Sequence, residues 1–343
     1  NIAEIVLIKD KLDFISLERA INLIIQDNDG LRLKITEVDG QPCQYVSKYN
    51  YSNIQFYDFS QTGGFEALYN WDEYKNGSCF ELLDSDLFYF VIFKIDENNC
   101  GFYIKTHHFI SDAWTIANLL ISGIVEYYCL LKSNKTSSMR INPSYLDYIS
   151  SENAYKETSN FEENKKFWED EFKTIPEVMS LKPSLSYYKD TKAKRKTFIL
   201  SKELTMQIFK YCKLTNNSPF TVFLSSLSIL IHKYTSNNDI VIGTPILNRS
   251  NQREKETVGM YISTVLVRLN VDIEISFIKY IDYVSKQWKQ ILNNQKYPYD
   301  LIHKDFKERQ KVNENLYDVV LSFQNAKHKK TKIEYSTEWV FTG

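Results

Sequence analysis

The chain has 343 residues, 43% of them hydrophobic and 15% aromatic, and its 42 Lys and Arg residues nearly balance its 43 Asp and Glu residues, leaving a formal charge of -1. Its length, about twice that of a usual domain, predicts two domains or lobes, and its charge balance provides no broad basic surface for nucleic acid or anionic lipid. The five scattered cysteines form no CxxC pair, which favours a reduced, cytoplasmic protein without a zinc site or a disulfide framework.

The ends of the sequence and its apolar runs bear on targeting. No signal peptide is recognisable, and no apolar run approaches the ~20 residues that span a bilayer, so we expect no membrane association. The first and last residues read as strands that lack natural termini. We therefore expect the chain to be a piece of a longer polypeptide.

The first half alternates strand-like and helix-like periodicity. A helix over 17–26 is predicted, with Ser16 as its N-cap, followed by a hairpin that turns at Asp39-Gly40. A second hairpin ends at two adjacent histidines, and an amphipathic helix capped by Asp112 or Thr115 follows it. Another amphipathic helix is predicted at 161–172, and strands at 2–8, 31–35, 42–46, 87–95 and 100–105.

The second half repeats this order of elements, which indicates an α/β (α+β) fold with two lobes of related design. A linker-like passage at 184–193 sets the boundary, so that an N-terminal lobe covers 1–183 and a C-terminal lobe covers 184–343. In the second lobe we expect helices at 202–214, 219–234 and 277–293, and strands at 196–200, 239–244, 261–269 and 319–323.

The adjacent histidines His107 and His108 are the strongest candidates for chemistry. They lie where a strand meets a loop, a position that fixes the backbone and exposes the side chain, and Asp112 follows four residues after His108. A structural or solvent-facing pair is the simpler interpretation. A metal site is not expected, because neighbouring strand residues point to opposite faces and no further ligands cluster nearby.

The stretch His107 to Ala113 resembles the HHxxxDG signature of nonribosomal peptide synthetase condensation domains, which are chloramphenicol-acetyltransferase-like acyltransferases. Ala113 replaces the final glycine of the signature. Other segments resemble the family's companion motifs in order and spacing: Asn28-Asp29-Gly30-Leu31-Arg32, Tyr145-Leu146-Asp147-Tyr148, Ile242-Gly243-Thr244-Pro245 with Asn248-Arg249, Val258 to Thr264, Tyr297-Pro298-Tyr299-Asp300 and Leu321 to Asn325.

This resemblance implies a V-shaped pseudo-dimer of two lobes, with an active-site tunnel between them and a second lobe that is incomplete at its end. It also implies amide formation, in which a carrier-bound aminoacyl amine attacks an acyl or peptidyl thioester on an upstream carrier. The expected partners are upstream and downstream carrier proteins and an adjacent adenylation domain. No cofactor bound by the domain is expected, because the phosphopantetheine arms of the carriers deliver the substrates.

The resemblance also assigns roles to single residues. His108 accepts the proton of the amine or orients it, His107 is a neighbour of uncertain use, and Asp112 holds the loop through an ion pair with Arg249 in the second lobe. We expect structural support from Ala113 and Trp114. Possible tunnel or substrate contacts are Tyr297, Tyr299, Ser263, Gln324 and Asn325, although the segment from Tyr297 to Asp300 could simply form a turn.

Two alternative functions stay open at this point. The chain could be a non-catalytic member of the family that recruits a partner or carrier. It could also be a free-standing acyltransferase that uses coenzyme A. Retention of His108 and Asp112 favours an active condensation domain over the non-catalytic alternative.

Overall fold

The computed structural model describes residues 1–134, 142–176, 194–310, 316–324 and 335–340. Contacts divide the chain into two compact units: unit 1 comprises Asn1–Asn153, Arg249–Tyr261 and Ala326–Gly343, and unit 2 comprises Ala154–Asn248 and Ile262–Asn325. The expected boundary at 184–193 lies outside the described residues. The units also differ from the two expected lobes, because unit 1 includes the segment Arg249–Tyr261, which we call the inserted segment.

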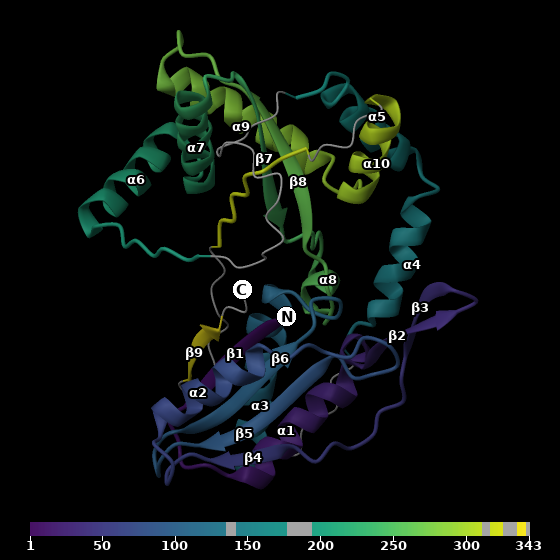
Figure 1. Cartoon of the computed structure of the whole chain (residues 1–343), viewed down its shortest axis with the longest axis vertical. Coiled ribbons are helices and arrows are strands. Elements are labelled where there is room, and N and C mark those ends of the chain that lie inside the picture. Colours follow the sequence, from purple (N-terminus) through teal and green to yellow (C-terminus); the bar gives the residue numbers. More distant parts are fainter. Residues whose placement is uncertain (135–141, 177–193, 311–315, 325–334, 341–343) are drawn as a thin grey trace. The chain divides into compact units, whose positions relative to one another are not determined.

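Unit 1 is built on a five-stranded sheet in the order β4-β5-β6-β1-β9 (Figure 1). All neighbours pair antiparallel except β4 and β5, which are parallel. The central strand β6 pairs Ile104 with Glu4 of β1 and with Phe90 of β5. The strands are β1 (Ile2–Ile8), β4 (Gln55–Asp58), β5 (Phe88–Lys94), β6 (Cys100–Thr106) and β9 (Tyr335–Val340).

Both faces of this sheet are largely buried at the strands β1, β5 and β6, which explains the nearly continuous apolar runs in β5 and β6. On one face, residues such as Val6 and Ile104 pack in one core with helices α1 (Phe14–Asp27) and α3 (Ser122–Lys132). On the other face, Ile5 and Tyr103 pack with Leu68 of α2 (Phe65–Asn76). This alternation follows from the two-residue period of a strand.

The remaining parts of unit 1 are short. A hairpin of β2 (Leu33–Val38) and β3 (Gln41–Val46) turns at Asp39-Gly40, as predicted, with positive φ at both turn residues. Helix α4 (Tyr145–Tyr155) follows α3, and its residues as far as Asn153 belong to unit 1. The inserted segment contains the short helix α8 (Gln252–Glu256).

Unit 2 has a two-stranded antiparallel sheet of β7 (Asp239–Ile246) and β8 (Ser263–Asn270) within a single apolar core. Serine caps begin three of its helices at the predicted positions, and Pro219 occupies the first turn of one of them. Its helices are α5 (Ser159–Glu171), α6 (Lys202–Thr215), α7 (Pro219–Thr235), α9 (Phe277–Asn293) and α10 (Tyr299–Gln310).

Several predicted elements were wrong. Asp13, not Ser16, caps α1, because its carboxylate accepts the Ser16 backbone N–H at 3.1 Å. The expected strand at 196–200 is irregular chain in which Ile199 is 95% exposed, and no strand of the described chain pairs with it. The expected strand at 319–323 reduces to an isolated bridge between Val320 and Gly243.

The described residues contain one helix that is long and apolar enough to cross a membrane, Thr115–Lys132, with a mean hydropathy of 1.2. It consists of a π-helical stretch, Thr115–Ile121, that continues into α3. More than half of its residues are buried inside the protein, where they pack with α1. Burial in a protein core explains this apolar character without a membrane.

Candidate active site

The histidine pair lies directly after a strand that is buried along its whole length. All seven residues of β6 are buried, and the His107 backbone N–H extends the sheet by donating to the carbonyl of Leu87 at 2.8 Å. The chain then turns, and Ile110 N–H donates to the His107 carbonyl at 3.2 Å. His108 is exposed at this turn, so its imidazole is accessible while its backbone is held by the sheet.

His107 is half-buried and engaged with its neighbours. Its Nδ1 accepts the backbone N–H of Phe109 at 3.2 Å, and its ring lies 4.6 Å from the Phe109 ring and 6.2 Å from the Phe80 ring. Burial lowers the pKa of His107, which favours a neutral ring. Because Nδ1 accepts a hydrogen bond, the proton of the neutral ring lies on Nε2. His107 therefore supports the turn that carries His108.

Lys105 strengthens the sheet beneath the turn. It is almost fully buried, and its ammonium donates to the backbone carbonyls of Lys75 at 2.6 Å and Ser78 at 2.7 Å, at the C-terminal end of α2. Carbonyl groups at a helix C-terminus carry partial negative charge, so this position suits a buried cation. The same ammonium lies 5.5 Å from the ring of Phe80, which contacts His107.

Asp112 is buried and accepts hydrogen bonds from three residues of unit 1. It caps the following helix by accepting the Thr115 backbone N–H at 2.8 Å. It also accepts the Tyr261 backbone N–H at 3.0 Å and forms an ion pair with Arg249 at 3.2 Å. The side chains of Arg249 and Asp112 are 0% and 2% exposed. The predicted Asp112–Arg249 pair is therefore present, and it lies within unit 1.

Arg249 has further buried partners besides Asp112. Its guanidinium donates to the carbonyls of Thr257 at 2.7 Å and Gly259 at 3.0 Å, and to the Thr115 hydroxyl at 2.7 Å. The ring of Tyr261 covers it at 3.9 Å from the guanidinium carbon. The arginine thus holds the inserted segment in a closed loop against the helix that follows the histidine pair.

The other two support residues of the signature also have clear positions. Trp114 donates from Nε1 to the Lys255 carbonyl at 3.0 Å, which gives the inserted segment another attachment. Ala113 is helical and is not among the described residues with positive φ. The backbone at this position therefore does not require the glycine of the family signature.

Sequence reasoning missed two contributors to this cluster. Thr115, considered only as a cap, donates its hydroxyl to the Gly259 carbonyl at 2.6 Å and also accepts from Arg249. Tyr261, interpreted as the start of a strand, lies in the inserted segment, and β8 begins only at Ser263. The position of Thr115 directly after Asp112-Ala113-Trp114 was a signal for the first residue. The place of Tyr261 in the companion segment Val258 to Thr264 was a signal for the second.

The residues proposed as tunnel or substrate contacts are not part of this cluster. Tyr297, Tyr299, Ser263 and Gln324 belong to unit 2, and Asn325 lies outside the described residues. Tyr297 is buried with its ring 5.0 Å from that of Phe161. Tyr299 begins α10, so the segment from Tyr297 to Asp300 leads into a helix.

Comparison with known proteins adds an independent line of information. A family model described as "Condensation domain" matches residues 1–342. Surfactin synthase subunit 1 of Bacillus subtilis (strain 168) is 33% identical over 337 residues, covering 97% of this chain and 9% of that protein. Gramicidin S synthase 2 of Brevibacillus brevis is 25% identical over 331 residues, covering 95% of this chain and 7% of that protein. The chain thus spans only a small part of the curated relatives that it matches.

Solved structures share the fold at low sequence identity. The starter condensation domain of rhizomide synthetase, solved in complex with C8-CoA, has a TM-score of 0.84 and 16% identity, covering 100% of this chain and 77% of that chain. VibH, a condensation enzyme, has a TM-score of 0.80 and 16% identity, covering 100% of this chain and 79% of that chain. The mixed α/β fold is therefore the one that condensation domains adopt.

Proposed function

The chain belongs to the family of condensation domains, which form amide bonds in nonribosomal peptide synthetases, and we propose that it joins an aminoacyl group to an acyl or peptidyl group, each held on its own carrier protein. In this reaction the amine nitrogen attacks the thioester carbonyl carbon. The carbon–sulfur bond breaks, the amine loses a proton, and the thiol of the upstream carrier is released. Atoms balance without a covalent intermediate on the protein.

The chemistry requires little of the protein beyond placement and proton handling. A thioester is already activated, so the chain needs no nucleophile of its own. Holding two reactants together corresponds to an effective molarity of about 10⁵–10⁸ M, whereas a general base contributes roughly 10²–10⁴-fold. We therefore expect positioning to provide most of the rate acceleration and His108 to provide the smaller share.

The observation that carries the proposal is the contrast between the two histidines. His107 is half-buried and accepts a backbone hydrogen bond, while His108 is exposed at the end of a buried strand. An exposed imidazole on a fixed backbone can accept a proton from the amine or orient it through a hydrogen bond. Asp112 is engaged by Arg249, Thr115 and Tyr261, which favours a structural role for it.

The proposal includes the arrangement and partners that the family resemblance implies. The two lobes would form a V with the reaction in a tunnel between them. Upstream and downstream carriers would deliver substrates on phosphopantetheine arms, next to an adenylation domain. All five cysteines are free thiols, which supports a reducing, cytoplasmic setting.

A second candidate differs only in the acyl donor. Octanoyl transfer from coenzyme A deserves a direct test, because the rhizomide synthetase starter domain, which shares the fold, was solved in complex with C8-CoA. The amine would attack the thioester of the acyl-coenzyme A in the same way. The two candidates make the same use of His108 and differ in whether an upstream carrier is needed.

The test is a condensation assay with two loaded carrier proteins, run in parallel with acyl-coenzyme A in place of the upstream carrier. We expect His108→Ala to lose roughly 10²–10⁴-fold in rate and His107→Ala to lose less, with both variants retaining the fold by circular dichroism. His108→Gln separates the two roles, because it keeps hydrogen bonding but cannot titrate. Turnover of His108→Ala at the wild-type rate would refute the assignment, and no product from either donor would refute the proposed function.

A further inference from the structure

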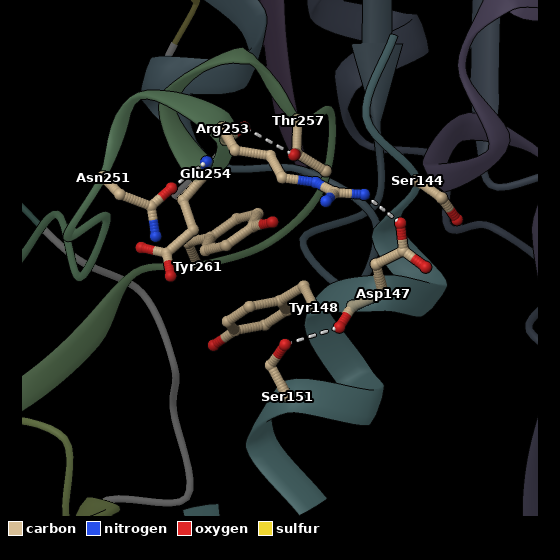
Figure 2. Close-up of a pocket in the computed structure, with 9 residues that line it drawn as sticks. All are labelled: Ser144, Asp147, Tyr148, Ser151, Asn251, Arg253, Glu254, Thr257 and Tyr261. Carbon is tan, nitrogen blue, oxygen red and sulfur yellow. Dashed lines mark hydrogen bonds and ion pairs between the residues drawn. The ribbon is translucent and has the colours of Figure 1, made fainter. Parts of the chain in front are cut away.

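The segment Tyr145-Leu146-Asp147-Tyr148 has no role in the reaction proposed above, yet three of its side chains contact the inserted segment. Tyr145 contacts Met260 and Gly259, Asp147 pairs with Arg253, and Tyr148 packs on Tyr261. The fourth residue, Leu146, is 44% exposed. One turn of α4 thus contacts the inserted segment through three of its four side chains, and Figure 2 shows this for Asp147 and Tyr148.

Tyr145 makes the most buried of these contacts. Its hydroxyl donates to the Met260 carbonyl at 2.8 Å, and its ring lies so close to Gly259 that a Cβ there would be 2.2 Å from the ring. The start of α4 is itself fixed, because Asp29 accepts the Tyr145 backbone N–H at 2.9 Å. Tyr145 therefore reaches the inserted segment from a helix end that the rest of unit 1 holds in place.

Tyr148 extends the contact through aromatic rings. Its ring lies 4.0 Å from the ring of Tyr261, and the guanidinium carbon of Arg249 lies 3.9 Å from the same Tyr261 ring. Tyr261 also donates its backbone N–H to Asp112. The hydroxyl of Tyr148 takes no part in this, because it donates to Glu152 on its own helix at 2.6 Å.

The outer edge of the contact is polar and incompletely filled. Arg253 and Asp147 form an ion pair there, with their side chains 66% and 56% exposed. Beside it lies a pocket of about 100 Å³, lined by residues of α4 and of the inserted segment (Figure 2). Tyr261 is one of the lining residues, and its buried hydroxyl has no hydrogen-bond partner among the described residues. The aromatic and Tyr145 contacts, not the exposed ion pair, therefore dominate the attachment.

We infer that Tyr145 and Tyr148 are positioning residues that clamp the inserted segment, which begins at Arg249, against Asp112. Asp112 of the signature and the adjacent Trp114 and Thr115 hold the segment on one side, and α4 holds it on the other. Loosening α4 would free Tyr261, which in turn would remove one of the hydrogen bonds that fix Asp112. The expected effect of these two residues on the condensation rate rests on the proposed function. Their expected effect on the stability of the inserted segment does not.

The test is native-state hydrogen exchange of the Gly259 and Tyr261 amides, which donate to Thr115 and Asp112. Tyr145→Phe and Tyr148→Phe are the same substitution on the same helix, but only the first removes a bond to the segment. We expect Tyr145→Phe to speed exchange of these amides about three- to tenfold and Tyr148→Phe to leave it unchanged. Tyr148→Leu, which removes the ring contact, should speed it about three- to tenfold.

Tyr74→Leu is the matched control, since Tyr74 is 77% exposed on α2 of the same unit. The clamp is refuted by one result. In that result Tyr148→Leu lowers the overall stability, but its Gly259 and Tyr261 amides exchange at the same rate as those of Tyr74→Leu. In the condensation assay, Tyr148→Leu should reduce kcat and Tyr148→Phe should not. Faster exchange in a protein that condenses neither donor would refute the proposed function and leave the clamp intact.

Discussion

The buried pair of Asp112 and Arg249 offers the sharpest test of what the signature does. Replacing Asp112 by Ala leaves the Arg249 guanidinium in a site where its side chain is 0% exposed. Removing one partner of a buried ion pair lowers the free energy of unfolding by ~3–5 kcal/mol, because the remaining charge is uncompensated. The carboxylate also satisfies the backbone N–H groups of Thr115 and Tyr261, so the loss should fall at the upper end of that range.

The same reasoning predicts that the losses in the free energy of unfolding from the two substitutions are strongly non-additive. Arg249→Met alone leaves a buried carboxylate and should cost a similar ~3–5 kcal/mol. The double variant Asp112→Ala/Arg249→Met leaves no charge buried at this site, so it should lose far less than the sum of the two single losses. In the double variant, three backbone carbonyls and the Thr115 hydroxyl lose the hydrogen bonds that Arg249 donates to them. Some loss should therefore persist.

Hydrogen exchange of the β6 amides measures these losses in unit 1 directly, since those amides exchange only when the central strand opens. Condensation rates are compared per folded molecule. If Asp112→Ala leaves β6 exchange unchanged while condensation vanishes, Asp112 acts in the chemistry and the structural assignment is refuted. If the two single losses add in the double variant, the two side chains are not coupled and the ion pair contributes no net attraction.

Two further predictions concern the rest of unit 1. Burial raises the pKa of Glu4 on β1 to about 8. Because the folded state then binds a proton more tightly than the unfolded chain, the free energy of unfolding should fall as pH rises from ~4.5 to ~8. Urea unfolding across this range should show the decline, and Glu4→Gln should make it smaller, whereas an equal decline in wild type and Glu4→Gln would refute the argument. Gly259→Ala should destabilise the protein by ~1–3 kcal/mol, because the new Cβ would meet the Tyr145 ring at 2.2 Å. The same change at Gly77, where the nearest atom would be 3.7 Å away, should be tolerated, and equal melting temperatures for the two variants would contradict the close approach.

Local signals in the sequence were sufficient for many of the elements. The helix predicted at 277–293 matches α9 in both bounds, because Ser276 supplies its cap and its apolar stripe follows the helical period. The hairpin at Asp39-Gly40 formed as predicted, since its turn residues tolerate positive φ. The Asp112–Arg249 pair was also anticipated, although only through the family resemblance and not through spacing.

Elements that depend on distant partners were less predictable. The run at 196–200 has strand-like residues, but in the described chain no strand pairs with it. The inserted segment illustrates the same limit on a larger scale, because it joins two strands of unit 2 in sequence and yet packs in unit 1. Nothing local in residues 249–261 reveals this, since the contacts that decide it come from Asp112, Thr115 and Tyr145, more than a hundred residues earlier.

These contacts show that the histidine signature has a structural role as well as a candidate reacting group. Within the signature, His108 is the exposed residue with the character of a reacting group, while Asp112 and the adjacent Trp114 and Thr115 bind the inserted segment. A reaction between two tethered, already activated substrates gains most from exact placement, so contacts that fix the backbone around the reacting group suit such chemistry. On this reasoning, the residues that hold the inserted segment should affect the rate of condensation through placement, separately from the proton handling assigned to His108.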